Sequence, residues 1–165
     1  MQCEPAPPAR LSLKVVRLVE SLTGARRLRH AGNPSEFVRG DFSAPHNDAG
    51  NGARRVSYVL HLAEGWDSAR RGGGLWWCGP PTVAVGAAHN ALTLFGVSRR
   101  SSHFVEPVRD DAPADQPGGG ASGGAPRRLA ISGFYVSDDD DEIAGWRAFA
   151  DAREPEPDDP GVVFV

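Results

Sequence analysis

Apolar residues near the start of the chain recur with the spacing of an amphipathic helix. Four of them would share one face of such a helix: Leu11, Val15, Leu18 and Leu22. Val16 and Val19 would widen this face, and Gly24 follows at a position where a left-handed helix cap is common. The pattern predicts one helix that ends before Gly24.

Beyond Gly24 the pattern changes to short runs of β-branched and aromatic residues, separated by turn-forming residues. The predicted strands are 36–42, 55–62, 75–77, 82–85, 91–97, 103–108 and 128–136. Almost no helical pattern separates them, which disfavours a doubly wound parallel sheet. We therefore predict an all-β core, a sandwich or barrel, with one N-terminal helix.

Two segments lack the apolar pattern of a packed domain. Residues 110–126 contain no aromatic or large aliphatic side chain, so we expect a disordered, glycine-rich insert there. Residues 138–165 are acidic and contain several prolines, which predicts a C-terminal tail. The predicted domain spans residues 11–137.

Composition excludes several kinds of function. The 18 basic residues are 17 Arg and the single Lys14, so Schiff-base chemistry and a Gly-Lys-Ser phosphate loop have almost no residue to use. The basic segment 10–39 lacks the interleaved aromatic residues of many nucleic-acid-binding surfaces, so direct nucleic-acid binding is not expected. The Gly-x-Ser-x-Gly match at residues 120–124 lies in a glycine-rich stretch rather than on a strand-to-helix elbow, which argues against a serine hydrolase.

Cysteine content and the N-terminus bear on location. Cys3 and Cys78 provide neither a four-thiolate zinc site nor a disulfide framework. The first residues lack a signal-peptide profile, and no apolar run approaches the roughly 20 residues that cross a bilayer. We expect an intracellular protein, cytoplasmic or nuclear, without a membrane partner.

A His-x-Asp pair is the first candidate for chemistry. On an extended chain, residues two apart point the same way, so His46 and Asp48 could chelate one metal ion. Taken alone, such a pair is more typical of a turn in which the aspartate accepts hydrogen bonds than of a metal site. Five segments then follow in order: RRVSYVLHLAEGWD, GGGLWW, HNALTLFGV, SSHFVEPV and RRLAISGFY.

With these segments the chain resembles the Fe(II)- and 2-oxoglutarate-dependent dioxygenases of the prolyl 4-hydroxylase-like superfamily. It is most similar to the subgroup that hydroxylates a proline of a small-subunit ribosomal protein, over roughly residues 12–137. The resemblance implies a double-stranded β-helix, or jelly roll, with an N-terminal supporting helix. It also implies hydroxylation by O2 of a C–H bond of a prolyl residue in a protein substrate, with ascorbate as a reductant. The resemblance to the subgroup implies a ribosomal protein as that substrate.

The resemblance assigns the metal to His46, Asp48 and His103. Two imidazoles and one carboxylate on one face of an octahedral Fe(II) leave three positions for a bidentate oxoacid and O2. The distal carboxylate of 2-oxoglutarate then needs a cation, and a buried arginine is suited to it. Arg128 is the candidate, because removing the predicted insert restores its expected spacing from His103.

Three further side chains are expected near the cosubstrate. Strand alternation places Ser132 on the face of Arg128, where its hydroxyl could help to hold the carboxylate. His61 stands where this family often has a cosubstrate-binding tyrosine, which leaves a cosubstrate contact and a core histidine equally open. Arg54 is expected at the entrance of the site. His30 and His89 are expected at the surface or in turns.

Two other classes of function remain open. A non-catalytic or degenerate β-helix binding module would explain His61 and the short segment ahead of His46, and it predicts no succinate formation. A cupin-like metal enzyme would use the same three ligands but would leave Arg128 without a role.

Overall fold

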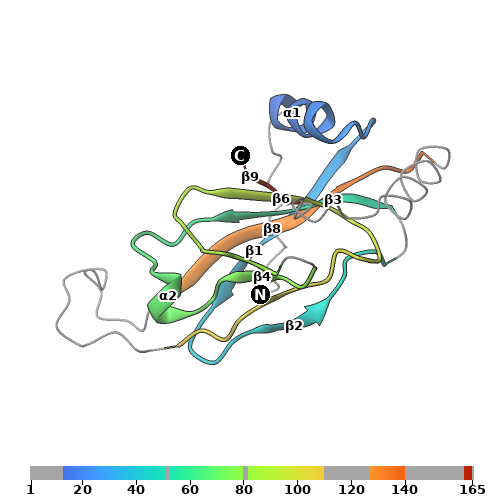
Figure 1. Cartoon of the computed structure of the whole chain (residues 1–165). Helices are drawn as coiled ribbons and strands as arrows, with labels where there is room; N and C mark the ends of the chain where they lie inside the picture. Colours follow the sequence, from blue (N-terminus) through green and yellow to red (C-terminus); the bar gives the residue numbers. More distant parts are fainter. Residues whose placement is uncertain (1–12, 51–52, 80–81, 110–126, 140–161, 165) are drawn as a thin grey trace, which may run out of the picture.

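The computed structural model describes residues 13–50, 53–79, 82–109, 127–139 and 162–164. Two antiparallel sheets face each other, and the helix α1 (Leu13–Thr23) lies on the outer side of the larger sheet (Figure 1). A second helix, α2 (Ser68–Arg71), is a single turn that Asp67 caps through its side chain. No helix of the described residues is long and apolar enough to cross a membrane.

The larger sheet has five strands, and the smaller sheet has four. The larger sheet is ordered β1 (Arg29–Phe37), β8 (Arg128–Val136), β3 (Arg54–His61), β6 (Leu92–Gly96) and β9 (Val162–Phe164). The smaller sheet is ordered β2 (Ser43–His46), β7 (His103–Val105), β4 (Leu75–Trp77) and β5 (Val83–Val85). Strands that are distant in sequence pair side by side, which confirms the predicted double-stranded β-helix with a supporting helix.

One predicted strand, 36–42, is wrong. Two strands lie in this region instead: β1 ends at Phe37, and β2 begins at Ser43. β1 is an edge strand paired only with β8, and its sequence RHAGNPSEF carries few apolar residues, in keeping with its partial burial. Pro34 is compatible with this edge position, since proline cannot donate to a second neighbour.

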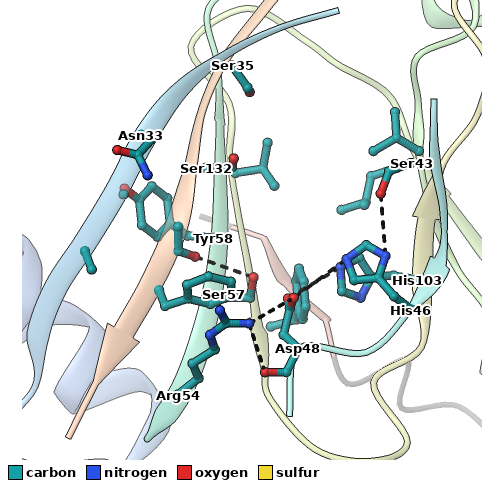
Figure 2. A pocket seen from close by; sticks show the side chains of 18 of the residues that line it. Asn33, Ser35, Ser43, His46, Asp48, Arg54, Ser57, Tyr58, His103 and Ser132 are labelled. Atoms are coloured by element: carbon teal, nitrogen blue, oxygen red, sulfur yellow. Dashed lines mark hydrogen bonds and ion pairs between the residues drawn. The ribbon is translucent and has the colours of Figure 1, made fainter. Parts of the chain in front are cut away.

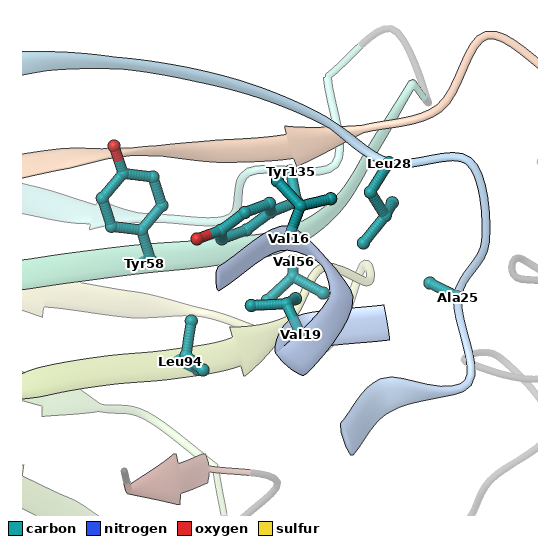
Figure 3. Packing of buried hydrophobic residues seen from close by; sticks show 8 residues of the cluster. All are labelled: Val16, Val19, Ala25, Leu28, Val56, Tyr58, Leu94 and Tyr135. Atoms are coloured by element: carbon teal, nitrogen blue, oxygen red, sulfur yellow. The ribbon is translucent and has the colours of Figure 1, made fainter. Parts of the chain in front are cut away.

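The helix α1 packs on β3, β6 and β8 through the valines of the predicted face and not through its leucines. Val16 and Val19 are buried against Val56, Leu94 and Tyr135 (Figure 3). Leu18 and Leu22 remain 43% and 44% exposed, so the predicted leucine stripe is not the packed face. Consecutive residues lie about 100° apart around a helix. Leu18 is therefore turned away from the sheet when Val19 faces it.

The predicted helix end is correct. Gly24 has a φ of 73°, and its N–H donates to the carbonyl of Glu20, as expected for a left-handed cap. The predicted insert 110–126 lies outside the described residues, and so does most of the predicted tail 138–165. Within that tail, β9 pairs with β6 as a fifth strand, which the sequence did not predict.

Candidate metal centre

Strand register brings the two candidate histidine ligands together. His46 ends β2 and is the register partner of His103, the first residue of β7. Directly opposed residues of an antiparallel pair project from the same face of a sheet. Their imidazole centroids therefore lie 4.4 Å apart, although 57 positions separate the residues in the chain (103 − 46 = 57).

Asp48 completes the group from the segment that follows β2. Its Oδ1 lies 3.7 Å from His46 Nε2, and its Oδ2 lies 3.5 Å from His103 Nε2. One ligand atom from each of the three residues can be chosen so that all lie within 4.8 Å of one another. The three side chains converge as Figure 2 shows, so the predicted His46, Asp48 and His103 cluster forms.

Main-chain carbonyls orient both imidazoles. His46 Nδ1 lies 2.7 Å from the carbonyl of Ala44, and His103 Nδ1 lies 2.8 Å from that of Ser101. A carbonyl oxygen can only accept, so each Nδ1 carries a proton, and in a neutral imidazole of this kind Nε2 keeps its lone pair. This is the tautomer that binds a metal through Nε2, with the second nitrogen fixed by a hydrogen bond.

His103 lies in an aromatic environment on the inner side of the smaller sheet. Its ring stacks on Trp77 with an interplanar angle of 10°, and Phe95 contacts it edge-on with centroids 4.7 Å apart. Burial lowers the pKa of His103 below its usual value, against the opposing effects of the Ser101 carbonyl and Asp48. The neutral imidazole, which is the metal-binding form, is favoured.

The cluster opens onto a cavity of about 520 Å³ between the two sheets. Its walls come from β1, β3, β6 and β8 of the larger sheet and from β2, β4 and β7 of the smaller one (Figure 2). Polar side chains line much of it, including Asn33, Ser35, Ser57 and Ser132. The cavity can therefore hold a polar small molecule beside the metal cluster.

Arg128 lies on the wall of this cavity and is 1% exposed. Its guanidinium lies 5.0 Å over the ring of Phe37, the residue opposite it in the β1–β8 register. Among the described residues no carboxylate pairs with it, and its Nε has no hydrogen-bond partner. Burial lowers the pKa of Arg128 to about 10, so it remains charged at neutral pH. A buried cation of this kind is stabilised by an anionic ligand.

β8 presents the predicted face to the cavity. Arg128, Ser132 and Phe134 line the cavity, as the alternation predicts. On the other face, Ile131 and Tyr135 pack in the cluster beneath α1. Ser132 thus lies where the sequence placed it, four residues along the strand from Arg128.

Arg54 lies between the cavity wall and the metal cluster. Its Nη1 lies 3.8 Å from Asp48 Oδ1 and donates to the Asp48 carbonyl at 3.3 Å. Its guanidinium also stacks 3.7 Å over the ring of Phe134. Arg54 therefore lines the cavity, as expected for a residue near the site, and it contacts the carboxylate that would bind the metal.

His61 has a different position from the other candidates. It is fully buried, it is absent from the cavity wall, and its Nδ1 lies 3.5 Å from Arg128 Nη2. Burial and the charge of Arg128 lower the pKa of His61 to about 4. The imidazole is therefore neutral at physiological pH, and it contacts the arginine without lining the cavity.

Of the two histidines expected at the surface, His89 is exposed and His30 is not. His30 lies half-buried on β1, where its Nε2 shares a hydrogen bond with the Tyr58 hydroxyl and its ring contacts Tyr135. The surface prediction for His30 is wrong because β1 was not predicted. Burial lowers the pKa of His30 and raises that of Tyr58.

Sequence reasoning missed two polar residues of the cavity wall and one glycine beside Arg128. Asn33 and Ser35 line it from β1, a strand whose composition gave no signal. Gly73 has a φ of 70°, and a Cβ there would lie 2.7 Å from Arg128 Cδ. The glycine run of residues 72–74 carries no sequence signal that its second glycine makes room for the arginine.

Known proteins match this chain in structure but not in sequence. No family model matches it, and no curated protein matches it in sequence. A Pseudomonas putida prolyl-4-hydroxylase superposes with a TM-score of 0.57 and 21% identity over 77% of this chain. A 2OG-Fe(II) oxygenase family oxidoreductase from Burkholderia pseudomallei gives 0.56 and 20% over 76%.

A third solved structure is a Trichoplax adhaerens prolyl hydroxylase in complex with a hypoxia inducible factor oxygen degradation domain peptide fragment. It gives a TM-score of 0.55 and 23% identity over 79% of this chain. The chain spans 63%, 52% and 57% of the lengths of these three structures. At this identity the likeness concerns the fold, and the chain has the jelly-roll fold of the 2-oxoglutarate and Fe(II) oxygenases.

Proposed function

We propose that this chain is an Fe(II)- and 2-oxoglutarate-dependent dioxygenase that hydroxylates a C–H bond. The observation that carries the proposal is the pairing of two features in one cavity. One is the convergent cluster of His46, Asp48 and His103, and the other is the buried guanidinium of Arg128, which no described carboxylate neutralises. A metal and an anionic cosubstrate are the ligands that these features fit.

The cluster fits ferrous iron in its donor set and orientation. Two imidazoles and one carboxylate would hold the ion as a facial triad, and each Nδ1 donates to the main chain, which leaves each Nε2 to face the metal. In such enzymes the bound iron couples oxidative decarboxylation of 2-oxoglutarate to hydroxylation of the substrate. The chain supplies the ligands, orients them and shields them within the cavity.

The cosubstrate is assigned to the larger sheet. Arg128 would hold the distal carboxylate of 2-oxoglutarate, and the Ser132 hydroxyl would donate to the same group. Arg54 lies nearer the metal, where it would neutralise part of the charge of Asp48 and border the bound oxoacid. Ascorbate, as the reductant that restores ferrous iron, is part of the same proposal.

We further assign the substrate class to a prolyl residue in a protein. Support comes from two of the structural neighbours, which are prolyl hydroxylases, and one of these holds a peptide. The order of sequence segments favours a ribosomal protein within that class. Residues 11–137 would form the catalytic domain, with the insert 110–126 between β7 and β8.

An anaerobic titration tests the proposal. Fe(II) and 2-oxoglutarate together should give the wild type a weak visible charge-transfer band, which Asp48→Ala should abolish. Arg128→Ala should need at least about tenfold more 2-oxoglutarate, because a charged hydrogen bond contributes about 1.5–3 kcal/mol. Arg127→Ala is the matched control, since Arg127 is exposed and pairs with Glu36 outside the cavity.

The outcomes separate the proposal from its alternative. Succinate release from 2-oxoglutarate, stimulated by proline-containing peptides, supports a prolyl hydroxylase. Metal binding without succinate, under any peptide condition, would assign the chain to the non-catalytic binding modules. An unchanged titration in Arg128→Ala would remove this residue from the cosubstrate site.

A further inference from the structure

Among the described residues, the polar partner of Arg128 is a histidine and not a carboxylate. Its Nη2 lies 3.5 Å from His61 Nδ1, across the pairing of β8 with β3. A guanidinium can only donate hydrogen bonds, so His61 Nδ1 is the acceptor and the imidazole proton resides on Nε2. This assigns His61 an acceptor role toward the protein.

His61 cannot reach a molecule in the cavity as Arg128 does. The side chain is completely buried and lies outside the set of residues that line the cavity, whereas Arg128 is part of the wall. Its Nε2 is buried without a hydrogen-bond partner among the residues described. Any influence of His61 on a bound anion therefore passes through Arg128.

The guanidinium is held from several sides. Phe37 lies against its face, Gly73 leaves space beside its Cδ, and His61 accepts from Nη2. The neutral state of His61 matters, because a protonated imidazole would repel the arginine. With Nη2 held, the Nε–H is available for a carboxylate, and the loss of side-chain entropy on binding is reduced.

We propose that His61 is a positioning residue that fixes the Arg128 guanidinium for an anionic cosubstrate, without touching the cosubstrate. This inference rests on the proposed function. It gives His61, which stands where the family often has a cosubstrate-binding tyrosine, an indirect role through Arg128. It implies that Arg128 requires a hydrogen-bond acceptor at the position of His61 Nδ1. A donor from His61 toward the cavity is not required.

Three substitutions test this role by the position of their polar atoms. His61→Asn places an amide oxygen near the position of Nδ1 and should keep the wild-type affinity for 2-oxoglutarate within about threefold. His61→Leu has nearly the same shape without an acceptor and should weaken binding by about tenfold. His61→Gln places its amide near Nε2 and should behave like His61→Leu.

The measurement is the anaerobic charge-transfer titration with Fe(II), together with Mn(II) affinity measured by calorimetry. The Mn(II) affinity should be the same in all four proteins, because His61 does not approach the metal ligands. Equal 2-oxoglutarate affinity in wild type and His61→Leu would overturn the inference while leaving the proposed function intact. A wild type that shows no 2-oxoglutarate binding would overturn both, and a loss in His61→Asn equal to that in His61→Leu would reject the acceptor role.

Discussion

At the scale of single residues, the histidines of this chain serve two different purposes. His46 and His103 donate through Nδ1 to carbonyls and present Nε2 to the cavity, whereas His61 accepts through Nδ1 from Arg128. Sequence could identify the two candidate ligands because the order of the segments around them resembles that of a known family. It could not decide the role of His61, because that role depends on a cross-strand contact and on burial.

The first prediction at this scale concerns pH. The pKa of His61 is about 4 in the folded protein, against about 6.5 in an unfolded chain. The unfolded state therefore takes up the proton more readily, so His61 contributes to stability above pH 6.5 and this contribution is lost as pH falls toward 4. Between pH 7.5 and pH 5 the wild type should lose about 2 kcal/mol more than His61→Leu in its free energy of unfolding.

Urea denaturation of both proteins at several pH values provides the measurement. The comparison with His61→Leu removes the contribution of the other titrating groups, which both proteins share. Parallel pH profiles would mean that His61 titrates normally in the folded state, and they would argue against its burial beside a charged arginine.

The second prediction concerns Gly73. Gly73→Ala would place a methyl group 2.7 Å from Arg128 Cδ, so the guanidinium must move, and 2-oxoglutarate binding should weaken by about tenfold. Gly65→Ala is a suitable control, because Gly65 also has a positive φ but nothing lies within 4 Å of its added Cβ. Both variants carry the backbone strain of alanine at positive φ, and only Gly73→Ala should alter the titration.

At the scale of elements, the outcome of sequence prediction depended on how much of each strand is buried. β4 and β8 were predicted with their observed bounds, since apolar residues mark them clearly. β1 and β2 were missed or misplaced, because an edge strand with Gly, Pro and Asn carries little hydrophobic pattern. The pairing of β2 with β7, which assembles the metal ligands, is a long-range contact that no local pattern predicts.

The helix α1 offers a test of which contacts stabilise the fold. Val19 is fully buried between α1 and the larger sheet, so Val19→Ala should cost about 2 kcal/mol in the free energy of unfolding. Leu18→Ala, on the exposed side of the same helix, should change it by less than about 1 kcal/mol. Denaturant unfolding of the two variants measures this difference.

The affinity for Mn(II) is the second quantity to measure in Val19→Ala and Leu18→Ala. The ligands lie on the smaller sheet and α1 lies on the outer side of the larger one, so Mn(II) should bind both variants as tightly as the wild type. A larger loss of stability in Leu18→Ala than in Val19→Ala would contradict the observed orientation of the helix.

At the scale of the whole molecule, the metal should link strands that are distant in sequence. His46 and Asp48 belong to β2 and the segment after it, and His103 belongs to β7, so a bound ion would favour the folded state. With Mn(II) at 100 times its Kd, the gain should be about 2.7 kcal/mol, or about 5–10 °C in Tm. Removing the metal with a chelator should reverse the shift.

Thermal unfolding of wild type, Asp48→Ala and Glu64→Ala checks this expectation. Asp48→Ala should show no shift with Mn(II), and Glu64→Ala should respond like the wild type, because the exposed Glu64 pairs with His89 rather than with the cluster. An equal shift in Asp48→Ala would place the metal at another site.

The division of the cavity between two sheets has a consequence for selectivity. The metal ligands belong to the smaller sheet and the segment after β2, whereas Arg128 and Ser132 belong to the larger one. A dicarboxylic oxoacid that joins the two would have to match the gap between the layers. Side chains that set this gap, such as Phe95, would then determine whether a four-, five- or six-carbon acid is preferred, even though they bind neither end of it.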